Sequence, residues 1–131
     1  MADASLRVEL VSADRIVWSG DAQMVIARTT EGELGILVGH APLLAVLVEA
    51  PIEVRTVDGE HWVAVANGGF MSVANNRISI ISEQVEASHD IDLEKARHDL
   101  ERARASGEED TEAQEAVRFA EARIRAVERA S

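Results

Sequence analysis

Two stretches of the sequence gather side chains whose types and spacing could do chemistry. Residues 32–44, "GELGILVGHAPLL", place three glycines and one histidine in an otherwise almost wholly apolar run. Residues 89–98, "HDIDLEKARH", bring two histidines together with three carboxylates. Glycine loops can cradle phosphate groups, a histidine can act as a general acid or base, and mixed histidine–carboxylate clusters can bind metal ions. Each of these functions requires particular residues at a particular spacing, which can be checked in the sequence.

The glycine-rich stretch does not meet the demands of a nucleotide-binding loop. Gly32, Gly35 and Gly39 follow neither phosphate-loop spacing, and no Gly-Lys-Ser/Thr comes after them. No predicted helix begins there to offer its backbone amides to a phosphate. We interpret these glycines as residues that turn the chain and let strands approach closely.

His40 lacks the neighbours that a catalytic histidine requires. It is followed by Ala41 and Pro42, which cannot continue a helix. No motif presents a nucleophile or an orienting carboxylate beside it. We expect His40 to lie at the end of a strand and to bond to backbone or to a partner.

The histidines and acids of residues 89–98 do not form a recognisable metal site. His98 and Glu94 are four residues apart and would share a helix face, but no second histidine–carboxylate pair completes the site. We interpret this stretch as a capped, solvated first helical turn. The chain also has no cysteine, which removes disulfides, thiol nucleophiles and thiolate ligands. We therefore expect no catalytic residue and no metal site.

Charge and hydropathy exclude several classes of partner. The formal net charge is −11, from 13 basic and 24 acidic side chains, and it opposes binding to nucleic acid or to anionic lipid. The opening "MADASLRVEL" has neither the basic nor the apolar region of an export signal. The uncharged run Leu34–Val48 is shorter than the roughly 20 apolar residues of a membrane helix, so we expect no direct membrane insertion. A protein partner with basic patches would suit this surface.

The elements that must position these residues fall into two parts, divided near Ser88. Residues 1–87 carry 17 charged side chains and seven of the eight glycines, whereas residues 88–131 carry 20 charged side chains. The short alternating runs of the first part predict about ten short antiparallel strands packed as a β-sandwich. The strand segments are expected at residues 6–10, 16–18, 24–26, 36–38, 43–48, 52–57, 60–66, 70–73, 77–82 and 85–86.

Two turn signals organise the second half of the predicted sandwich. Asp58-Gly59 suits the positive backbone angles of a type I′ turn, so residues 52–57 and 60–66 should form a hairpin. The sequence Ala-Asn-Asn at 74–76 is a second turn signal, between the two strands that follow.

Residues 88–131 predict an antiparallel pair of helices. Asp92 can cap the first helix, and Thr111 begins the second with a capping-box spacing to Gln114. The break between them falls at residues 106–110. The apolar stripes repeat at spacings of three and four and comprise Leu93, Ala96, Leu100, Ala103, Ala113, Val117, Ala120, Ile124 and Val127.

These stripes are rich in alanine, which limits how firmly the helices can be held. Burying one methyl group contributes only about 0.8 kcal/mol, and a surface pair such as Glu121 with Arg125 adds about 0.2–0.5 kcal/mol. We therefore interpret residues 88–131 as a movable arm that can leave the sandwich or open at modest cost.

Three stretches together resemble a known family. "GELGILVGHAPLL" at residues 32–44, "VANGGFMSVANNRISIISEQVE" at 65–86 and "DIDLEKARHDLERA" at 90–103 resemble the epsilon subunit of bacterial F-type ATP synthases. The resemblance covers nearly the whole chain. Its most specific elements are "GELGI…GHAPL" and the "AxGGFxxV" pattern at Ala66–Val73.

The resemblance implies a non-catalytic rotor subunit of the proton-translocating enzyme. In this family the sandwich, here residues 1–87, binds the gamma subunit and rests on the c-subunit ring, which helps couple proton flow to ATP synthesis. The helical arm, here residues 88–131, either folds onto the sandwich or extends along gamma toward the alpha/beta catalytic head, where it blocks ATP hydrolysis. The implied location is peripheral, at the cytoplasmic face of the bacterial cell membrane, within the F1 sector.

The resemblance also assigns roles to three residues of the sandwich. Glu33, in the "GELGI" turn, is the acid expected to meet basic groups on the c-subunit loops. His40 and Ser12 match family positions on the face that meets gamma. On this interpretation residues 32–44 are a docking surface and not a pocket.

An ATP-sensing element in the arm is the least well matched part. Some members of the family bind ATP through an Ile/Leu-Asp-x-x-Arg-Ala motif, and the stretch here is "IDLEKA". Asp92 matches, but Lys95 stands where arginine is expected. Arg102 and Arg123 fall on further basic positions, whereas Phe119 occupies a site that is arginine in the strongest binders. Lysine lacks the planar fork of arginine, so we expect ATP binding to be weak or absent.

Two other functional classes compete with this interpretation. One is a free-standing interaction module, a β-sandwich with a helical arm that binds an unrelated complex. The other is an enzyme that uses Glu33 and His40 as acid and base, which would turn over substrate as an isolated chain. Binding to an F1 preparation that lacks epsilon would separate both from the rotor subunit.

Overall fold

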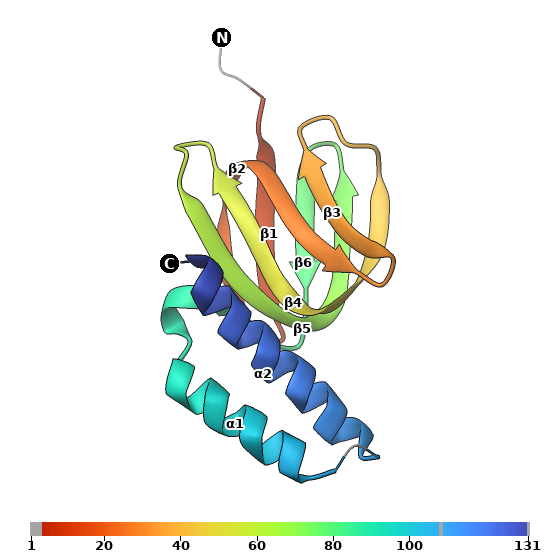
Figure 1. Cartoon of the computed structure of the whole chain (residues 1–131). Coiled ribbons are helices and arrows are strands. Elements are labelled where there is room, and N and C mark those ends of the chain that lie inside the picture. The colour runs from red at the N-terminus through yellow and green to blue at the C-terminus, as the bar shows by residue number, and fades with distance from the viewer. Residues whose placement is uncertain (1–3, 108, 131) are drawn as a thin grey trace.

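The computed structural model describes residues 4–107 and 109–130, which form seven β-strands, one 3₁₀ turn and two α-helices (Figure 1). The strands come first and the helices follow, so the expected order of sandwich and helical hairpin is confirmed. The elements are β1 (Leu6–Ser12), β2 (Arg15–Thr29), β3 (Gly32–Leu37), β4 (Leu43–Thr56), β5 (His61–Ala74), β6 (Arg77–Ile81), β7 (Val85–Ala87), a 3₁₀ turn (Ser88–Asp90), α1 (Leu93–Ala105) and α2 (Thr111–Ala130).

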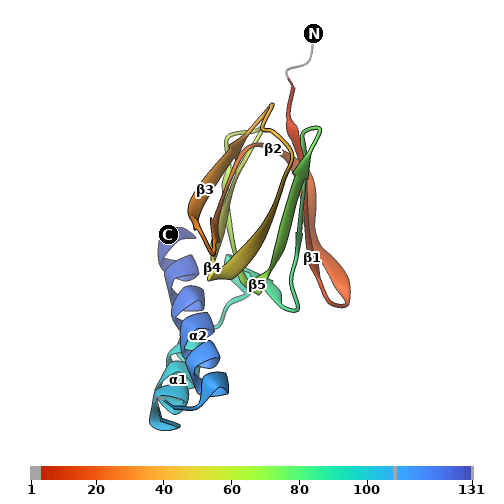
Figure 2. The same cartoon turned by 90° about the vertical axis from the view of Figure 1, so that its right-hand side faces the viewer.

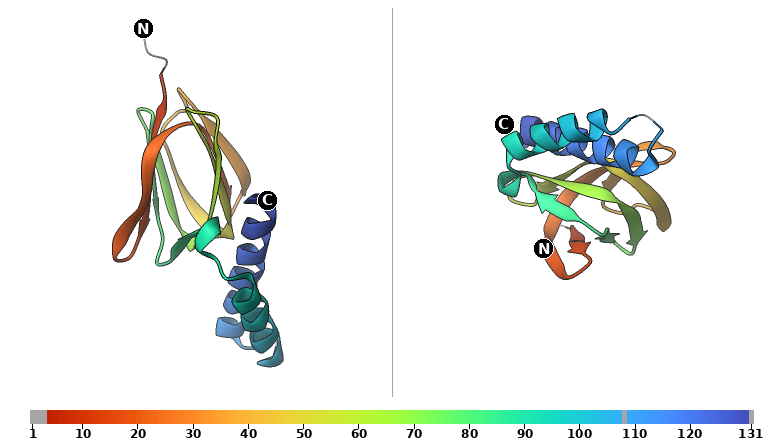
Figure 3. Two further views of the ribbon diagram at one scale, coloured as in Figure 1. Left: turned by 90° about the vertical axis from the view of Figure 1, so that its left-hand side faces the viewer. Right: turned by 90° about the horizontal axis from the view of Figure 1, so that it is seen from below.

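The strands form one sheet that closes on itself. The order along the sheet is β1-β6-β5-β4-β2-β3, β7 pairs with β5, and an additional pairing between β1 and β2 completes the closure. Figure 2 and the left view of Figure 3 show the resulting two layers. The pairings are antiparallel except for β1 with β6, which is parallel. The expectation of a wholly antiparallel arrangement is therefore wrong at this one pair.

The ten expected strand segments are merged into seven strands. β2, β4 and β5 each contain two of the segments. β2 carries register shifts between Ala22 and Met24 and between Ile26 and Thr29, and such irregularities let one strand bend from one layer into the other. In β5 the bend comes at Gly68-Gly69, which have φ values of +73° and +99°. A Cβ at Gly69 would overlap the carbonyl oxygen of Ile81, so this close approach requires glycine.

The core of the sandwich is almost entirely aliphatic. Alternate residues of β1 point inward, and the three largest of them, Leu6, Val8 and Leu10, are completely buried. Two tryptophans close one side: Trp18 and Trp62 stack with ring centroids 5.1 Å apart and an interplanar angle of 24°. This dense packing on every strand makes the sandwich a rigid support for its surface loops.

The two predicted turns exist, but the one turn type that was assigned, at Asp58-Gly59, differs from expectation. The type I′ turn is at Asn75-Asn76, with φ values of +52° and +62°. At the β4–β5 hairpin only Gly59 has a positive φ, of +85°. The N–H of Gly59 donates to the Thr56 carbonyl at 3.0 Å, and the Thr56 N–H donates to the Glu60 carbonyl at 2.9 Å. This pattern fits a turn that ends in one left-handed residue, so the hairpin is confirmed and the type I′ assignment at Asp58-Gly59 is wrong.

Both helices begin at an aspartate cap. The Asp92 carboxylate accepts a hydrogen bond from the backbone N–H of Lys95 at 3.1 Å, which confirms its expected capping role. At α2 the cap is Asp110, whose Oδ1 accepts from the N–H of Glu112 at 3.0 Å. Thr111 is therefore the first helical residue and not the cap. Aspartate takes precedence because its carboxylate also suits the positive end of the helix.

The two helices are antiparallel, and α2 lies between α1 and the sandwich (Figure 1; Figure 3, right). The expected stripe of α2 supplies only one of its two contact faces. A second face presents Ala122 and Ala126, both completely buried, to Val63 and Val65 on β5. Small alanine side chains allow the helix backbone to approach the sheet closely. No helix among the described residues is long and apolar enough to cross a membrane.

Candidate functional site

Glu33 lies at the start of β3, next to the turn that joins β2 to β3. Its side chain is exposed and stands opposite Arg28 in the β2–β3 ladder. It has no ion pair with any other described residue. The carboxylate is therefore available to a group outside the chain.

His40 lies in the loop between β3 and β4 and is held by backbone contacts. Its backbone N–H donates to the Leu37 carbonyl at 3.1 Å, and the ring atom Nδ1 lies 2.7 Å from the Ala41 carbonyl oxygen. Because a carbonyl oxygen can only accept, Nδ1 carries the proton in this arrangement. The adjacent Gly39 N–H donates to Asn76 Oδ1 at 2.7 Å, which ties the loop to the β5–β6 turn. This is the backbone-bonded histidine at a strand end that the sequence led us to expect.

The structure does not bring Glu33 and His40 together. Glu33 lies at the start of β3, and His40 lies beyond its end. At a rise of about 3.3 Å per residue, the strand spans about 13 Å between Glu33 and Leu37 alone. An acid and a base that act on one substrate must both reach its reacting atoms. The arrangement gives no support to an enzyme that uses this pair.

Ser12 ends β1 at the other end of the sandwich from the β3–β4 loop (Figure 1). Its hydroxyl donates to the Glu83 carbonyl at 3.2 Å, and the Ser82 N–H donates to the Val11 carbonyl at 3.0 Å. The end of β1 is thereby fixed to the segment that follows β6.

An apolar row crosses the outer surface of five strands, and we did not predict it from the sequence. The strand registers pair its members directly across neighbouring strands, so that each stands beside the next. Four of the five are about half exposed, with exposed fractions of 48–57%. We call this set the outer apolar row, and it consists of Val46 on β4, Phe70 on β5, Ile81 on β6, Val11 on β1 and Ile16 on β2.

The outer apolar row lies next to one of the two residues expected on the gamma-facing surface, because Ser12 directly follows Val11. On β4, Leu44 is 72% exposed and lies two residues before Val46, on the side of the loop that holds His40. A contiguous apolar surface of this kind marks an interaction site more often than scattered apolar residues do. The sequence carried a signal for it, since Ile80 and Ile81 are adjacent and only one of them can point inward.

Three arginines on α2 pair with glutamates on the sandwich. Arg118 Nε lies 3.3 Å from Glu49 Oε2 in the first half of the helix, and Arg129 Nη1 lies 3.2 Å from Glu53 Oε2 near its C-terminal end. The third is Arg123, in the second half of the helix, described below. We did not foresee these pairs, because arginines spaced along a helix usually indicate a solvated face.

Arg123 is the only charged side chain in the buried class among the described residues, with 8% exposure. Its Nη2 donates to Glu86 Oε2 on β7 at 3.3 Å, and its Nη1 donates to Asp99 Oδ2 on α1 at 3.4 Å. Its Nε lies 3.1 Å from Glu86 Oε1, but the direction does not complete a hydrogen bond, so this buried donor is unsatisfied within the described residues. The guanidinium carbon also lies 5.7 Å from the centre of the Phe119 ring.

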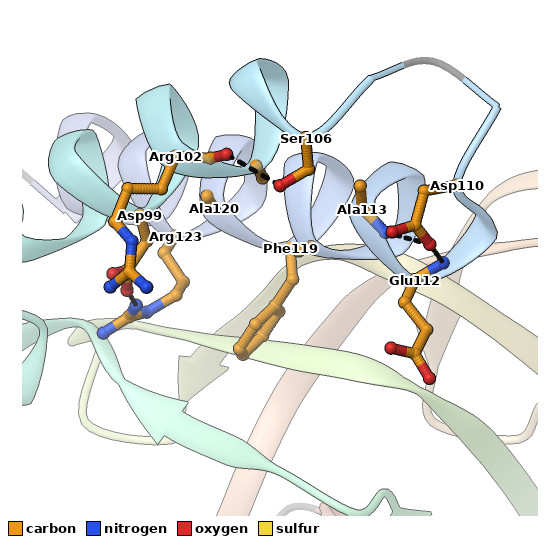
Figure 4. Close-up of a pocket in the computed structure, with 11 residues that line it drawn as sticks. Asp99, Arg102, Ser106, Asp110, Glu112, Ala113, Phe119, Ala120 and Arg123 are labelled. Atoms are coloured by element: carbon orange, nitrogen blue, oxygen red, sulfur yellow. Dashed lines mark hydrogen bonds and ion pairs between the residues drawn. The ribbon is translucent and has the colours of Figure 1, made fainter.

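A cavity of about 420 Å³ opens between α1 and α2 beside Arg123. Figure 4 shows Asp99, Arg102 and Arg123 grouped at one end, Phe119 in the middle, and the acidic Asp110 and Glu112 at the other end. Ala113, Ala120 and Ser106 complete much of the wall.

Of the four residues expected to hold ATP, only Arg102 and Arg123 line this cavity. Asp92 caps α1, and the Lys95 ammonium lies 3.6 Å from Asp99 Oδ2. The cavity therefore offers a triphosphate one arginine, Arg102, that has no ion pair with any described residue, and one arginine, Arg123, that is already paired with two carboxylates. Two further acidic side chains, those of Asp110 and Glu112, also line it. This donor set does not fit a nucleotide well.

The histidine–acid stretch at residues 89–98 shows no metal centre. His89 Nε2 lies 3.6 Å from Asp90 Oδ1 on the surface. Within residues 4–107 and 109–130, no group of three or more histidine and acidic side chains is placed to hold a metal ion.

Comparisons with known proteins bear on the whole chain. A family model described as "ATP synthase, Delta/Epsilon chain, beta-sandwich domain" matches residues 5–88. The ATP synthase epsilon chain of Streptomyces avermitilis is 49% identical over 124 residues, covering 95% of this chain and 96% of that one. The ATP synthase epsilon chain of Rhodococcus jostii is 45% identical over 128 residues, covering 97% and 99%.

Solved structures give the same picture. A chain of the Euglena gracilis mitochondrial ATP synthase, in a structure of its OSCP, F1 and c-ring, superposes with a TM-score of 0.80 at 28% identity and covers 91% of this chain and 79% of its own. A chain from the central stalk and c-ring of the Tetrahymena thermophila mitochondrial enzyme shares the fold, with a TM-score of 0.62 at 19% identity and coverage of 99% and 98%. The resemblance noted from the three sequence motifs is confirmed, and the chain belongs to the epsilon-chain family of ATP synthase, whose members are non-catalytic subunits of that enzyme.

Proposed function

We propose that this chain couples rotation to catalysis as a subunit of the central stalk, and that it docks on the gamma subunit through the outer apolar row. The observation that carries the proposal is the row itself: an aliphatic and aromatic surface that crosses five strands of an otherwise strongly acidic protein. Burial of such a surface supplies the free energy of a stable protein contact. Ser12, next to Val11, and His40, in the loop that precedes β4, would lie at the edge of that contact.

Glu33 would make the second contact, with basic groups on the loops of the c-subunit ring. Its support is the exposed carboxylate at the β2–β3 turn, which has no ion-pair partner among the described residues. Charged groups at the rim of an interface set its register and its rate of formation more than its affinity. This contact would place the subunit peripherally, in the F1 sector at the cytoplasmic face of the bacterial membrane.

The two parts of the chain would divide the work. Residues 1–87 would bind the rotor, and residues 88–131 would act as a regulatory arm that inhibits ATP hydrolysis when it extends toward the alpha/beta head. The small alanine contacts between α2 and β5 support a docked arm that can leave. ATP would be at most a weak regulatory ligand of this arm, since Asp92, Lys95, Arg102 and Arg123 do not converge on one site.

Reconstitution tests the docking surface directly. Purified chain is added to an F1 preparation that lacks epsilon, and its affinity and its effect on the ATPase rate are measured. The double substitution Phe70→Gln with Ile81→Gln should weaken binding about tenfold or more, because apolar side chains would no longer enter the interface. Val57→Gln is the matched control, since Val57 is 44% exposed but lies outside the row, in the β4–β5 loop.

The outcome separates the proposal from the free-standing module. A chain that neither binds F1 nor alters its rate would contradict the stalk role. Equal loss of binding in the double variant and in Val57→Gln would move the docking surface away from the outer apolar row.

A further inference from the structure

Arg123 joins three elements of the chain through one guanidinium. It belongs to α2, it donates to Glu86 on β7, and it donates to Asp99 on α1. The contact with Glu86 crosses the boundary between arm and sandwich, while the contact with Asp99 crosses the boundary between the two helices. Both boundaries therefore depend on the same side chain.

The charges around Arg123 are balanced from within the chain. The two carboxylates that flank the guanidinium take the positions that a bound anion would otherwise occupy, and Lys95, 3.6 Å from Asp99 Oδ2, supplies a second positive charge. Phe119 covers one side of the guanidinium, with 5.7 Å between its ring centre and the guanidinium carbon. The group needs no external ligand to be stable in the docked arm.

We propose that Arg123 is an internal latch that holds the arm in its docked state and makes undocking from the sandwich and opening of the helix pair a single step. This inference deepens the proposed regulatory role of residues 88–131 and rests on it. In the latch, the carboxylates of Glu86 and Asp99 accept the hydrogen bonds of the guanidinium that the phosphates of a bound nucleotide would otherwise accept.

The physical asymmetry between the docked and undocked states supports the latch. In the docked arm, removal of the guanidinium leaves the carboxylates of Glu86, 20% exposed, and Asp99, 36% exposed, without the positive charge between them, and this is costly for partly buried charged groups. In the undocked arm both carboxylates are solvated, and the loss of Arg123 changes little. The substitution therefore shifts the equilibrium toward the undocked state.

The other arginine pairs at the interface are weaker candidates for this role. The side chains of Arg118 and Arg129 are 51% and 42% exposed, whereas that of Arg123 is 9% exposed. Exposed ion pairs contribute little because water screens them and their side chains lose freedom on pairing. Among the described residues, the ion pairs of Arg118 and Arg129 reach only glutamates of the sandwich, so these pairs do not link the two boundaries.

The natural absence of cysteine allows thiol reporters to measure both boundaries in the full-length chain. Ala122→Cys places a thiol in the contact with Val63 and Val65, and Ala103→Cys places one on the buried face of α1. Val8→Cys, inside the sandwich, reports on global unfolding. The rate at which each thiol reacts with a labelling reagent measures how often its surroundings open.

Arg123→Met is compared with Arg125→Met in each reporter background. Arg125 carries the same charge on the same helix, but it faces solvent with 45% exposure, and its one ion pair within the described part of the chain is with Glu121 at 4.0 Å. Arg123→Met should accelerate labelling at positions 122 and 103 by the same factor, on the order of 10- to 100-fold, because hydrogen bonds to charged groups are lost. Labelling at position 8 should not change, and Arg125→Met should change none of the three.

Two outcomes would overturn the inference, and a third would move the same test to a second variant. Labelling rates in Arg123→Met within twofold of those in Arg125→Met would show that Arg123 does not hold the arm. Acceleration at position 122 without acceleration at 103, or the reverse, would show that the two boundaries open independently. Acceleration at position 8 would show that the variant unfolds, and Glu86→Gln then replaces it, with the same expected acceleration at 122 and 103.

This experiment is independent of the stalk role. It uses the isolated chain, so a failed latch leaves binding to F1 untouched. A chain that does not bind F1 but shows the expected labelling pattern would retain the latch and lose the stalk role.

Discussion

Arg129, in the last turn of α2, donates from Nη1 to Oε2 of Glu53 on β4 at 3.2 Å. The other oxygen of the same carboxylate lies 3.0 Å from Nε2 of His61 on β5. The Glu53 carboxylate thus contacts both the C-terminal end of the arm and the neighbouring strand. A basic residue in this turn also complements the negative end of the helix, so the contact fixes the C-terminal end of the arm.

We predict that Arg129→Met releases this end without destabilising the protein. The Arg129 side chain is 42% exposed and the Glu53 side chain 20%, so the free energy of unfolding should fall by less than about 1 kcal/mol. Hydrogen-exchange protection of the last turn of α2 should decrease, while protection of β4 and β5 stays the same. A loss of protection that spreads along the whole of α2 would mean that the pair holds the entire arm.

A second prediction concerns the close approach at Gly69. Gly69→Ala should lower the free energy of unfolding by about 2 kcal/mol or more, because the new Cβ meets the Ile81 carbonyl and φ is +99°. Gly35→Ala is the control, since no heavy atom lies within 4 Å of its added Cβ and its φ is not positive. Chemical denaturation of both variants gives the comparison, and equal stability would remove the steric argument.

The third prediction concerns the independence of the sandwich. A chain that ends at Ala87 should fold and bind gamma, because its core and its closed sheet involve no residue of the arm. The stack of Trp18 on Trp62 supplies a near-ultraviolet circular dichroism signal that should survive the truncation. Val63 and Val65 lose their cover, so some loss of solubility is expected but not loss of the cooperative transition. An unfolded product would contradict the division at residue 88.

The fourth prediction concerns the ring contact. Glu33→Lys should weaken the coupling of proton flow to catalysis in membranes, because it places like charges together, and the defect should ease at higher salt. The stability of the isolated chain should barely change, since the side chain is exposed on β3. Glu31→Lys, an exposed acid in the adjacent turn, is the control. Unaltered proton pumping with Glu33→Lys would remove this contact.

The fifth prediction concerns nucleotide. The isolated chain should show no saturable ATP binding below about millimolar, since two missing charge-assisted hydrogen bonds at about 1.5–3 kcal/mol each weaken binding roughly 10²- to 10⁴-fold. Lys95→Arg together with Phe119→Arg should raise the affinity by adding donors beside Arg102. Titration calorimetry on both proteins measures this, and micromolar affinity in the unmodified chain would show that these donors are dispensable.

The features that could be predicted from the sequence are those set by local patterns. The alternation in Leu6, Val8 and Leu10 marks an inward face, and Asp92 marks the start of α1. The prediction that Thr111 caps α2 was wrong, because the adjacent Asp110 competes for the same backbone N–H donors. The sequence pattern also predicted two strands in place of each of β2, β4 and β5. The reason is that similar residues occur at a bend within a long strand and at a break between two strands.

What could not be predicted depends on register across the fold. The outer apolar row exists only because five strands align its members, and their positions in sequence run from Val11 to Ile81 without a common spacing. Arg123 was expected only as a basic position of a weak ATP site, since nothing local indicates that Glu86 and Asp99 converge on it. Lys95 and Asp92 fit a motif in sequence, but in the fold they serve the first turn of α1.

The parallel pairing of β1 with β6 sets an order of events during synthesis. Arg7 pairs with Arg77 in this ladder, and a ribosome that adds about 5–20 residues per second needs roughly 4 to 14 s to make the chain between them. Until then the nascent β1 can pair only with β2, and one of its edges stays open to the ribosome surface and to chaperones. The segment that becomes the arm leaves the exit tunnel only after the strand that closes the sheet. The strands that receive α2 therefore leave the tunnel, and can complete their surface, before α2 itself emerges to occupy it.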